Sequence, residues 1–165
     1  NDLLLLAQLN ETPNEPVQPV DVAEILRART DDLRVQHPDR RVTFDSPDSM
    51  IIQGRPDLLE RLFANVFANV HHHTAHIAPV DVVVSASTDM VSVTIDDGGG
   101  GMSDDMMKHA NEGGVRFASE RARSTGGSGL GLPIMHSIVR QHGGTLTFSH
   151  SPLGGLRVTI TLARN

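Results

Sequence analysis

The sequence contains no cysteine, tryptophan or tyrosine, and only five phenylalanines among its 165 residues. The absence of cysteine excludes a disulfide scaffold and thiolate chemistry, and it agrees with a reducing compartment. The scarcity of aromatic side chains argues against a platform on which nucleic-acid bases stack. Acidic residues outnumber basic ones by 20 to 14. The charge balance therefore also disfavours a nucleic-acid partner.

Long apolar runs are absent as well, although 38% of the residues are apolar, as in an ordinary globular domain. The leucine run at residues 3–6 is too short to span a membrane. It also lacks the basic start and the small-residue exit of a signal peptide. We therefore expect a domain that makes no membrane contact of its own.

The chain divides into a short N-terminal segment and one domain. Residues 1–16 are predicted to form the end of an apolar helix and a proline-rich linker, and residues 17–165 the domain. Periodicity and capping residues predict a helix from Asp21 to His37, a second with Pro56 near its first turn and an apolar face from Leu58 to Val70, and a third over 129–142. Alternation predicts strands at 41–45, 49–53, 80–87, 90–95, 145–149 and 156–162. Because hairpins dominate the strand connections, we expect a two-layer α/β sandwich: a mixed, mostly antiparallel sheet with helices on one face.

The stretch 126–132 (GGSGLGL) holds four glycines in six positions and precedes an apolar helix. A glycine turn that feeds a helix start suits an anion, because free N–H groups and the helix dipole point outward. Alone, such a turn is more often a helix cap. It is not a nucleotide loop of the lysine type, since no Gly-Lys-Ser or Gly-Lys-Thr occurs.

Two polar features interrupt apolar elements. Asn65 and Asn69 share one face of a helix, where each amide either bonds to a strand or serves a ligand. Alternation from Val91 places Asp97, and not Asp96, on the inward side of its strand. A carboxylate there can accept a hydrogen bond from the exocyclic amine of adenine, whereas guanine presents a carbonyl at that place.

Three segments together resemble the N, G1 and G2 boxes of the ATP-binding catalytic domain of sensor histidine kinases, in the GHKL ATPase superfamily. They are 65–74 (NVFANVHHHT), 97–101 (DGGGG) and 126–132, the last followed by HGG at 142–144. The resemblance covers about residues 17–163 and implies the GHKL fold with a long mobile ATP lid between Asp97 and Thr125.

The resemblance also implies a binding site for ATP and Mg²⁺. Asn69 is the implied catalytic residue and ligand of Mg²⁺, a role that suits a hard amide oxygen. His72 stands where the family has Lys or Arg near the phosphates, and His73 where it has His or Tyr. The implied nucleotide-binding residues are Asn65, Asn69, His72, His73, Asp97, Gly99, Gly101, Gly127, Ser128, Gly129, Leu130 and Gly131.

The sequence departs from the family pattern in several places. Val70 replaces the usual Ala, Gly100 replaces a common Pro, and the Phe-containing lid motif is reduced to Arg116-Phe117. His72 also weakens the implied phosphate contact, because imidazole is mostly uncharged at neutral pH. We therefore expect a looser lid than is usual.

The implied activity is that of an ATP:protein-L-histidine phosphotransferase. In the family the acceptor histidine precedes an acidic residue, but none of the nine histidines here does. The resemblance therefore implies transfer to a separate dimerisation domain or partner chain, and then to a response regulator.

Residues 1–16 would be the end of the dimerisation hairpin, and the domain would be cytoplasmic, within or beside a membrane-bound sensor. The alternatives are an anti-sigma-type serine kinase and a degenerate nucleotide-binding or scaffold domain.

The run His71–His73, with His76, does not predict a zinc site. Consecutive helical residues point in different directions, so one ion cannot use all three, and cysteine or carboxylate support is missing.

Overall fold

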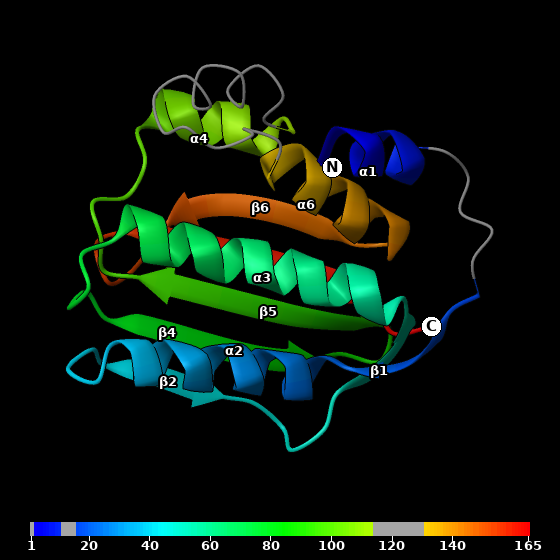
Figure 1. Cartoon of the computed structure of the whole chain (residues 1–165), viewed down its shortest axis with the longest axis horizontal. Helices are drawn as coiled ribbons and strands as arrows, with labels where there is room; N and C mark the ends of the chain where they lie inside the picture. Colours follow the sequence, from blue (N-terminus) through cyan, green and yellow to red (C-terminus); the bar gives the residue numbers. More distant parts are fainter. Residues whose placement is uncertain (1, 11–15, 114–130) are drawn as a thin grey trace.

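The computed structural model describes residues 2–10, 16–113 and 131–165, without the side chains of Asn10, His72 and His73. Helices and strands are interspersed along the chain (Figure 1). The helices are α1 (Asp2–Asn10), α2 (Val22–Gln36), α3 (Pro56–His73), α4 (Asp104–Asn111) and α6 (Gly131–Gln141). The strands are β1 (Gln18–Asp21), β2 (Val42–Asp45), β3 (Ile51–Gly54), β4 (Val80–Ala86), β5 (Met90–Asp97), β6 (Thr145–His150) and β7 (Leu156–Ala163). Three pairs of these strands are adjacent in sequence: β2 and β3, β4 and β5, and β6 and β7.

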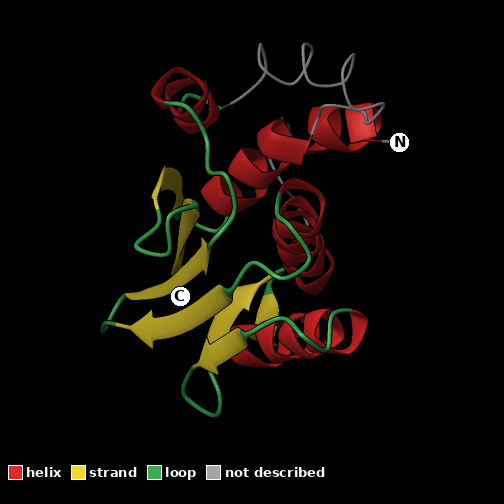
Figure 2. Ribbon diagram, turned by 90° about the vertical axis from the view of Figure 1, so that its left-hand side faces the viewer, coloured by secondary structure: helices red, strands yellow, loops and turns green. Residues whose placement is uncertain are grey.

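Five strands form the main sheet in the order β2-β4-β5-β7-β6, while β1 and β3 form a separate antiparallel pair. Only the β2–β4 pairing is parallel within this described sheet. Figure 2 shows the helical layer on one side of the sheet, and Figure 1 shows α2, α3 and α6 crossing that face. The predicted two-layer α/β sandwich is confirmed.

Helix α2 begins and ends where its sequence predicts. The Asp21 carboxylate accepts hydrogen bonds from the backbone N–H groups of Ala23 (3.0 Å) and Glu24 (3.4 Å), so it caps the helix. The same oxygen accepts from the N–H of Met50 (2.9 Å). The cap therefore also fixes the segment that leads into β3.

The core lies between α3 and the sheet. Leu59, Leu62 and Phe63 are completely buried, as are Val93 and Ile160 from the central strands. Each such side chain stabilises the fold by about 1.5–3 kcal/mol relative to its exposed state. The wide apolar face of α3 thus holds the helix, and the asparagines on it, firmly against the sheet.

The two short strands after α2 do not form a hairpin. The sequence predicts strands joined by the turn at 46–48, but β2 pairs in parallel with β4, and β3 pairs with β1. Strands of four residues carry too little pattern to specify a partner. Their partners are instead chosen by burial, since Val42 and Ile52 belong to the core.

Helix α1 lies beside α6 (Figure 1). Leu9 is buried there, and the side-chain amide of Gln141 donates to the Leu9 carbonyl at 2.6 Å. An ion pair between Asp2 and Arg61 adds a contact to α3. The leucine-rich segment is therefore helical and packed onto the domain. In the part of the chain that the structure describes, no helix combines the length and apolarity that crossing a membrane requires.

Candidate functional site

A cavity of about 160 Å³ opens between α3, α6 and the sheet. A cavity of about 150 Å³ accepts a benzene ring, so this one has room for a flat heterocycle. Among the described residues around it, Asn69 and Asp97 alone have polar side chains. Its lining residues are Val66, Asn69, Val70, Asp97, Gly101, Met102, Met106, Leu132, Met135, Phe148, Leu156 and Val158.

Asp97 is the last residue of β5 and is 6% exposed. Its Oδ1 accepts hydrogen bonds from the backbone N–H groups of Gly99 (3.0 Å) and Leu156 (3.2 Å). Within the described part of the chain, Oδ2 accepts none. One carboxylate oxygen is thus held by the backbone, and the other remains available to a ligand in the cavity.

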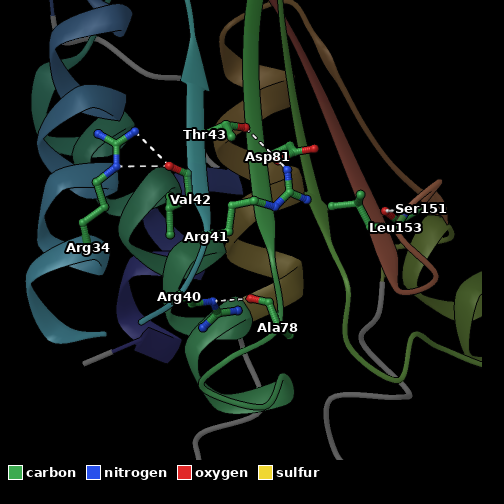
Figure 3. Close-up of polar contacts among 9 residues, drawn as sticks. All are labelled: Arg34, Arg40, Arg41, Val42, Thr43, Ala78, Asp81, Ser151 and Leu153. Carbon is green, nitrogen blue, oxygen red and sulfur yellow. Dashed lines mark hydrogen bonds and ion pairs between the residues drawn. The ribbon is translucent and has the colours of Figure 1, made fainter. Parts of the chain in front are cut away.

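Two glycines let the backbone come close to this carboxylate. A Cβ on Gly155 would lie 2.2 Å from Asp97 Oδ1, and a Cβ on Gly99 would lie 2.7 Å from Thr74 Cγ2. Gly155 ends a tight turn in which the Ser151 hydroxyl accepts from the N–H of Leu153 at 3.0 Å (Figure 3). Sequence analysis missed Gly155, because its closeness to Asp97 depends on how β5 and β7 pair.

The neighbouring Asp96 has a different role. Its two oxygens accept from Nε and Nη2 of Arg157, both at 2.8 Å, and its side chain is 7% exposed. Alternation along β5 therefore places Asp97 at the cavity and Asp96 in an ion pair with β7, as the strand pattern predicts.

The two asparagines of α3 differ in position. Both side chains are half-buried, but Asn69 lines the cavity and Asn65 does not. Neither amide side chain hydrogen-bonds to any described residue. Within the described residues, therefore, the asparagines do not bond to a strand. Asn69 is left in a position to face a ligand, and a role for Asn65 remains a prediction.

Helix α6 begins beside the cavity. Gly131 is its first residue, and Leu132 in its first turn lines the cavity, so the free N–H groups at the helix start lie near it. Gly101 lines the cavity with φ at +71°, a conformation that suits glycine. The predicted residues Gly127, Ser128, Gly129 and Leu130, and the side chains of His72 and His73, lie outside the described residues.

A buried arginine, Arg40, lies close enough to Asp97 for their charges to interact, and sequence analysis did not single it out. Arg40 is 4% exposed and donates to the carbonyl of Ala78 (2.6 Å, Figure 3) and to the Thr74 hydroxyl (2.6 Å). Burial lowers the pKa of its guanidinium, and the negative charge of Asp97 opposes that effect. Arg40 therefore supports the loop after α3, where Thr74 packs against Gly99.

Met106 of α4 and Met102 just before that helix close another side of the cavity. The side-chain amide of Asn111 both donates to the Phe148 carbonyl (3.0 Å) and accepts from its N–H (2.6 Å). The His136 ring on α6 bonds to the Ala110 carbonyl at 2.7 Å. The first part of the predicted lid is thus a helix anchored to β6 and α6, while 114–130 lies outside the described residues.

Comparison with known proteins follows this geometry. The family described as histidine kinase-, DNA gyrase B- and HSP90-like ATPases matches residues 54–165, which include β5, the cavity and α6. This chain belongs to that ATPase family.

The resemblance to sensor histidine kinases is confirmed by its relatives. The chain is 33% identical to the signal transduction histidine-protein kinase BaeS of Escherichia coli, over 87% of this chain and 31% of BaeS. It is 32% identical to the probable sensor histidine kinase TcrY of Mycobacterium tuberculosis, over 92% of this chain and 32% of TcrY.

Solved structures agree with the fold of this ATPase-family domain. The ATP-binding domain of PrrB from Mycobacterium tuberculosis matches with a TM-score of 0.69 and 28% identity, over 92% of this chain and 99% of that one. Full-length ShkA in complex with AMPPNP matches with a TM-score of 0.78 and 22% identity, over 100% of this chain and 35% of that one. The chain spans about a third of the length of the curated relatives.

Proposed function

We propose that this ATPase-family domain binds Mg-ATP in the cavity and donates the γ-phosphate to a histidine on a separate dimerisation domain or partner chain. The observation that carries the proposal is the Asp97 carboxylate, held through Oδ1 by two backbone N–H groups at the edge of an apolar cavity. A buried acceptor in apolar surroundings needs a partner, and the exocyclic amine of adenine supplies one.

The base occupies the cavity in this proposal. A planar purine fits between the apolar walls, where three methionines provide adaptable, polarisable contacts. A hydrogen bond to a charged group contributes about 1.5–3 kcal/mol. Guanine would place its carbonyl oxygen opposite the carboxylate, so Asp97 selects adenine.

The phosphates extend towards the start of α6. Free N–H groups and the helix dipole at Gly131 attract negative charge. We assign Gly127, Ser128, Gly129 and Leu130 to the same phosphate loop, and His72 and His73 to contacts beside the nucleotide. Asn69 suits the Mg²⁺ that bridges the phosphates, because Mg²⁺ prefers oxygen ligands.

Phosphoryl transfer then depends on positioning and on neutralising charge, so the domain needs no protein base of its own. Its curated relatives are sensor histidine kinases. The partners in this proposal are a histidine-bearing dimerisation domain and then a response regulator. No feature of the structure favours the anti-sigma-type serine kinase or a scaffold without transfer.

The base pocket is tested by Asp97→Asn. The substitution places a donor amide opposite the adenine amine, so we expect ATP affinity to fall about ten- to a hundredfold. Asp96→Asn is the matched control: it weakens the ion pair with Arg157 and so lowers stability, but leaves ATP affinity within about twofold of the original. Titration calorimetry and thermal unfolding on both variants separate the two effects. Equal ATP affinities in Asp97→Asn and the parent chain would contradict the pocket.

The metal role is tested by Asn69→Ala. We expect the gain in ATP affinity on adding Mg²⁺ to disappear, while affinity for adenosine, which lacks phosphates, stays unchanged. Ser85→Ala, at an exposed position of β4 that is not part of the cavity lining, serves as the control. A Mg²⁺ effect of the same size in Asn69→Ala and the control would assign the metal to other ligands.

A further inference from the structure

Three histidines meet where helices α2 and α3 end. His37 ends α2, His71 lies in the last turn of α3, and His76 follows in the loop after α3. One ring nitrogen from each histidine can be chosen so that the three nitrogens lie within 4.8 Å of one another. None of the three belongs to the described lining of the nucleotide cavity.

The rings already have nearly the geometry of a metal site. Nε2 of His37 and Nδ1 of His71 are 3.1 Å apart. In a tetrahedral zinc site with Zn–N bonds of about 2.0–2.1 Å, two ligand nitrogens lie roughly 3.3 Å apart. The His37–His71 pair therefore matches one edge of such a tetrahedron.

His76 can supply the third ligand with a small movement. Its ring lies 4.5 Å from that of His37 and 5.7 Å from that of His71, measured between centroids. The residue is exposed and lies in a loop, so its side chain is free to change rotamer when a metal ion binds.

From this cluster we propose that His37, His71 and His76 bind one Zn²⁺ ion, with water as the fourth ligand. Three imidazole nitrogens suit a borderline-soft transition metal. Mg²⁺ prefers oxygen ligands and does not compete here. The site is thus separate in place and in chemistry from the Mg²⁺ of the proposed nucleotide site, and it does not depend on that proposal.

Bound zinc would link the end of α2 to the end of α3 and the loop that follows. That loop holds Thr74, which accepts a hydrogen bond from Arg40 and packs against Gly99. Zinc would therefore stiffen the wall beside Asp97. The positive charge of Arg40 opposes the cation, and the neutral form of the three rings favours it.

The competing explanation is a simple hydrogen bond between two neutral imidazoles, with no affinity for metal. Sequence offers another alternative, zinc binding by the run His71–His73 alone. Zinc binding by the parent chain would exclude a hydrogen bond alone. Loss of that binding in His37→Ala would exclude the run His71–His73 alone, because His37 lies 34 residues before His71 and is not part of the run.

The test is titration calorimetry with Zn²⁺ on the untagged, metal-free chain. We expect one ion per chain, and a loss of affinity of at least about 100-fold in both His37→Ala and His76→Ala, since even changes in partners outside the ligand shell cost roughly 10–100-fold. Tetrahedral Co²⁺ bands in the visible spectrum should appear in the parent and disappear in both variants. His150→Ala, which removes an exposed histidine beside Asp104, is the matched control and should bind as the parent does.

Both variants are expected to fold. The backbone N–H that caps α2 at His37 stays in His37→Ala, and His76 is exposed. Circular dichroism checks this, and a folded His76→Ala alone is sufficient for the test. Absence of zinc binding by the parent chain would overturn the proposal, and so would zinc affinity that survives in the His37→Ala or His76→Ala variant.

Discussion

Gly155 decides where the Asp97 carboxylate lies, although it belongs to the turn before β7 and Asp97 ends β5. A Cβ at position 155 would lie 2.2 Å from Asp97 Oδ1 and 2.5 Å from the Asp97 carbonyl oxygen. No flexible side chain can give way there, because the second contact is with backbone. The carboxylate, its two backbone donors and the turn after β6 therefore form one unit.

Gly155→Ala is expected to destabilise the domain by about 1–3 kcal/mol, the usual cost of overpacking, and to reduce ATP binding because Asp97 moves. Gly100→Ala is the control, since a Cβ there meets nothing within 4 Å in the described structure. Thermal unfolding and nucleotide titration of both variants check the prediction. Similar behaviour of the two alanine variants would mean that the turn relaxes without moving Asp97.

His142 shows how burial sets the charge of a single residue. It is 8% exposed, Nδ1–H donates to the Ile138 carbonyl (2.8 Å), and Nε2 accepts from the N–H of Arg55 (3.1 Å). A second ring proton would face the Arg55 N–H. Burial is the main reason that the pKa of His142 is lowered. The hydrogen bond to the Ile138 carbonyl opposes this effect, the charge of Arg55 adds to it, and Asp57 opposes it.

The sign of the pH dependence follows. Because the pKa is lower in the folded state, the unfolded state binds the proton first as the pH falls. This contribution to stability is full above about pH 6.5, the pKa of an unperturbed histidine, and is lost as the pH falls towards the folded pKa. Denaturant unfolding between about pH 8 and about pH 5 should show this loss in the parent. The loss of stability should be smaller in His142→Gln. An equal dependence of stability on pH in both proteins would assign the loss to other groups, such as His136, whose pKa is also lowered by burial.

At the scale of elements, α4 is held to β6 by the side-chain amide of Asn111, which hydrogen-bonds to backbone groups of β6 as a neighbouring strand would. Asn111 exchanges two hydrogen bonds with the backbone of Phe148 on β6, and Phe148 also lines the cavity. This contact joins the end of α4 to the wall of the proposed base pocket. Opening of α4 must break both bonds.

Asn111→Ala should loosen α4 without unfolding the domain. Each lost hydrogen bond costs roughly 0.5–1.5 kcal/mol, so amide hydrogens of residues 106–111 should exchange about ten- to a hundredfold faster. Amides of α3 report on global stability and should change less. Uniform acceleration in both helices would show that Asn111 supports the whole fold instead of α4.

Local signals predicted α2, α3, α6 and their ends, because capping and helical period act within a few residues. Asp21 caps α2 and Gly143 ends α6 with φ at +67°, both readable in the sequence. The partners of β2 and β3 could not be predicted, since pairing with β4 and β1 depends on burial far along the chain. For the same reason, the sequence could not predict that Gly155 and Arg40 support the site or that His37 contacts His71.

At the scale of the whole molecule, the candidate site exists only when the two-layer fold is complete. The cavity takes Asp97 from β5, Asn69 from α3, Leu132 from α6 and Phe148 from β6. Among the described side chains no histidine lines the cavity, and His37, His71 and His76 cluster where α2 and α3 end. The arrangement is suited to holding a nucleotide for an acceptor that comes from outside.

We therefore expect the isolated chain to bind ATP but not to phosphorylate itself on histidine. The acceptor must lie in line with the γ-phosphate, and His142 is instead buried with both ring nitrogens bonded, while His136 is bonded to α4. Incubation with γ-labelled ATP and Mg²⁺ should give no acid-labile phosphate. Label should appear only when a second polypeptide supplies an exposed histidine followed by an acidic residue, and Asp97→Asn should then strongly reduce it at ATP concentrations below saturation. Acid-labile label on the pure chain that disappears on replacing one of its own nine histidines would contradict transfer to a separate acceptor.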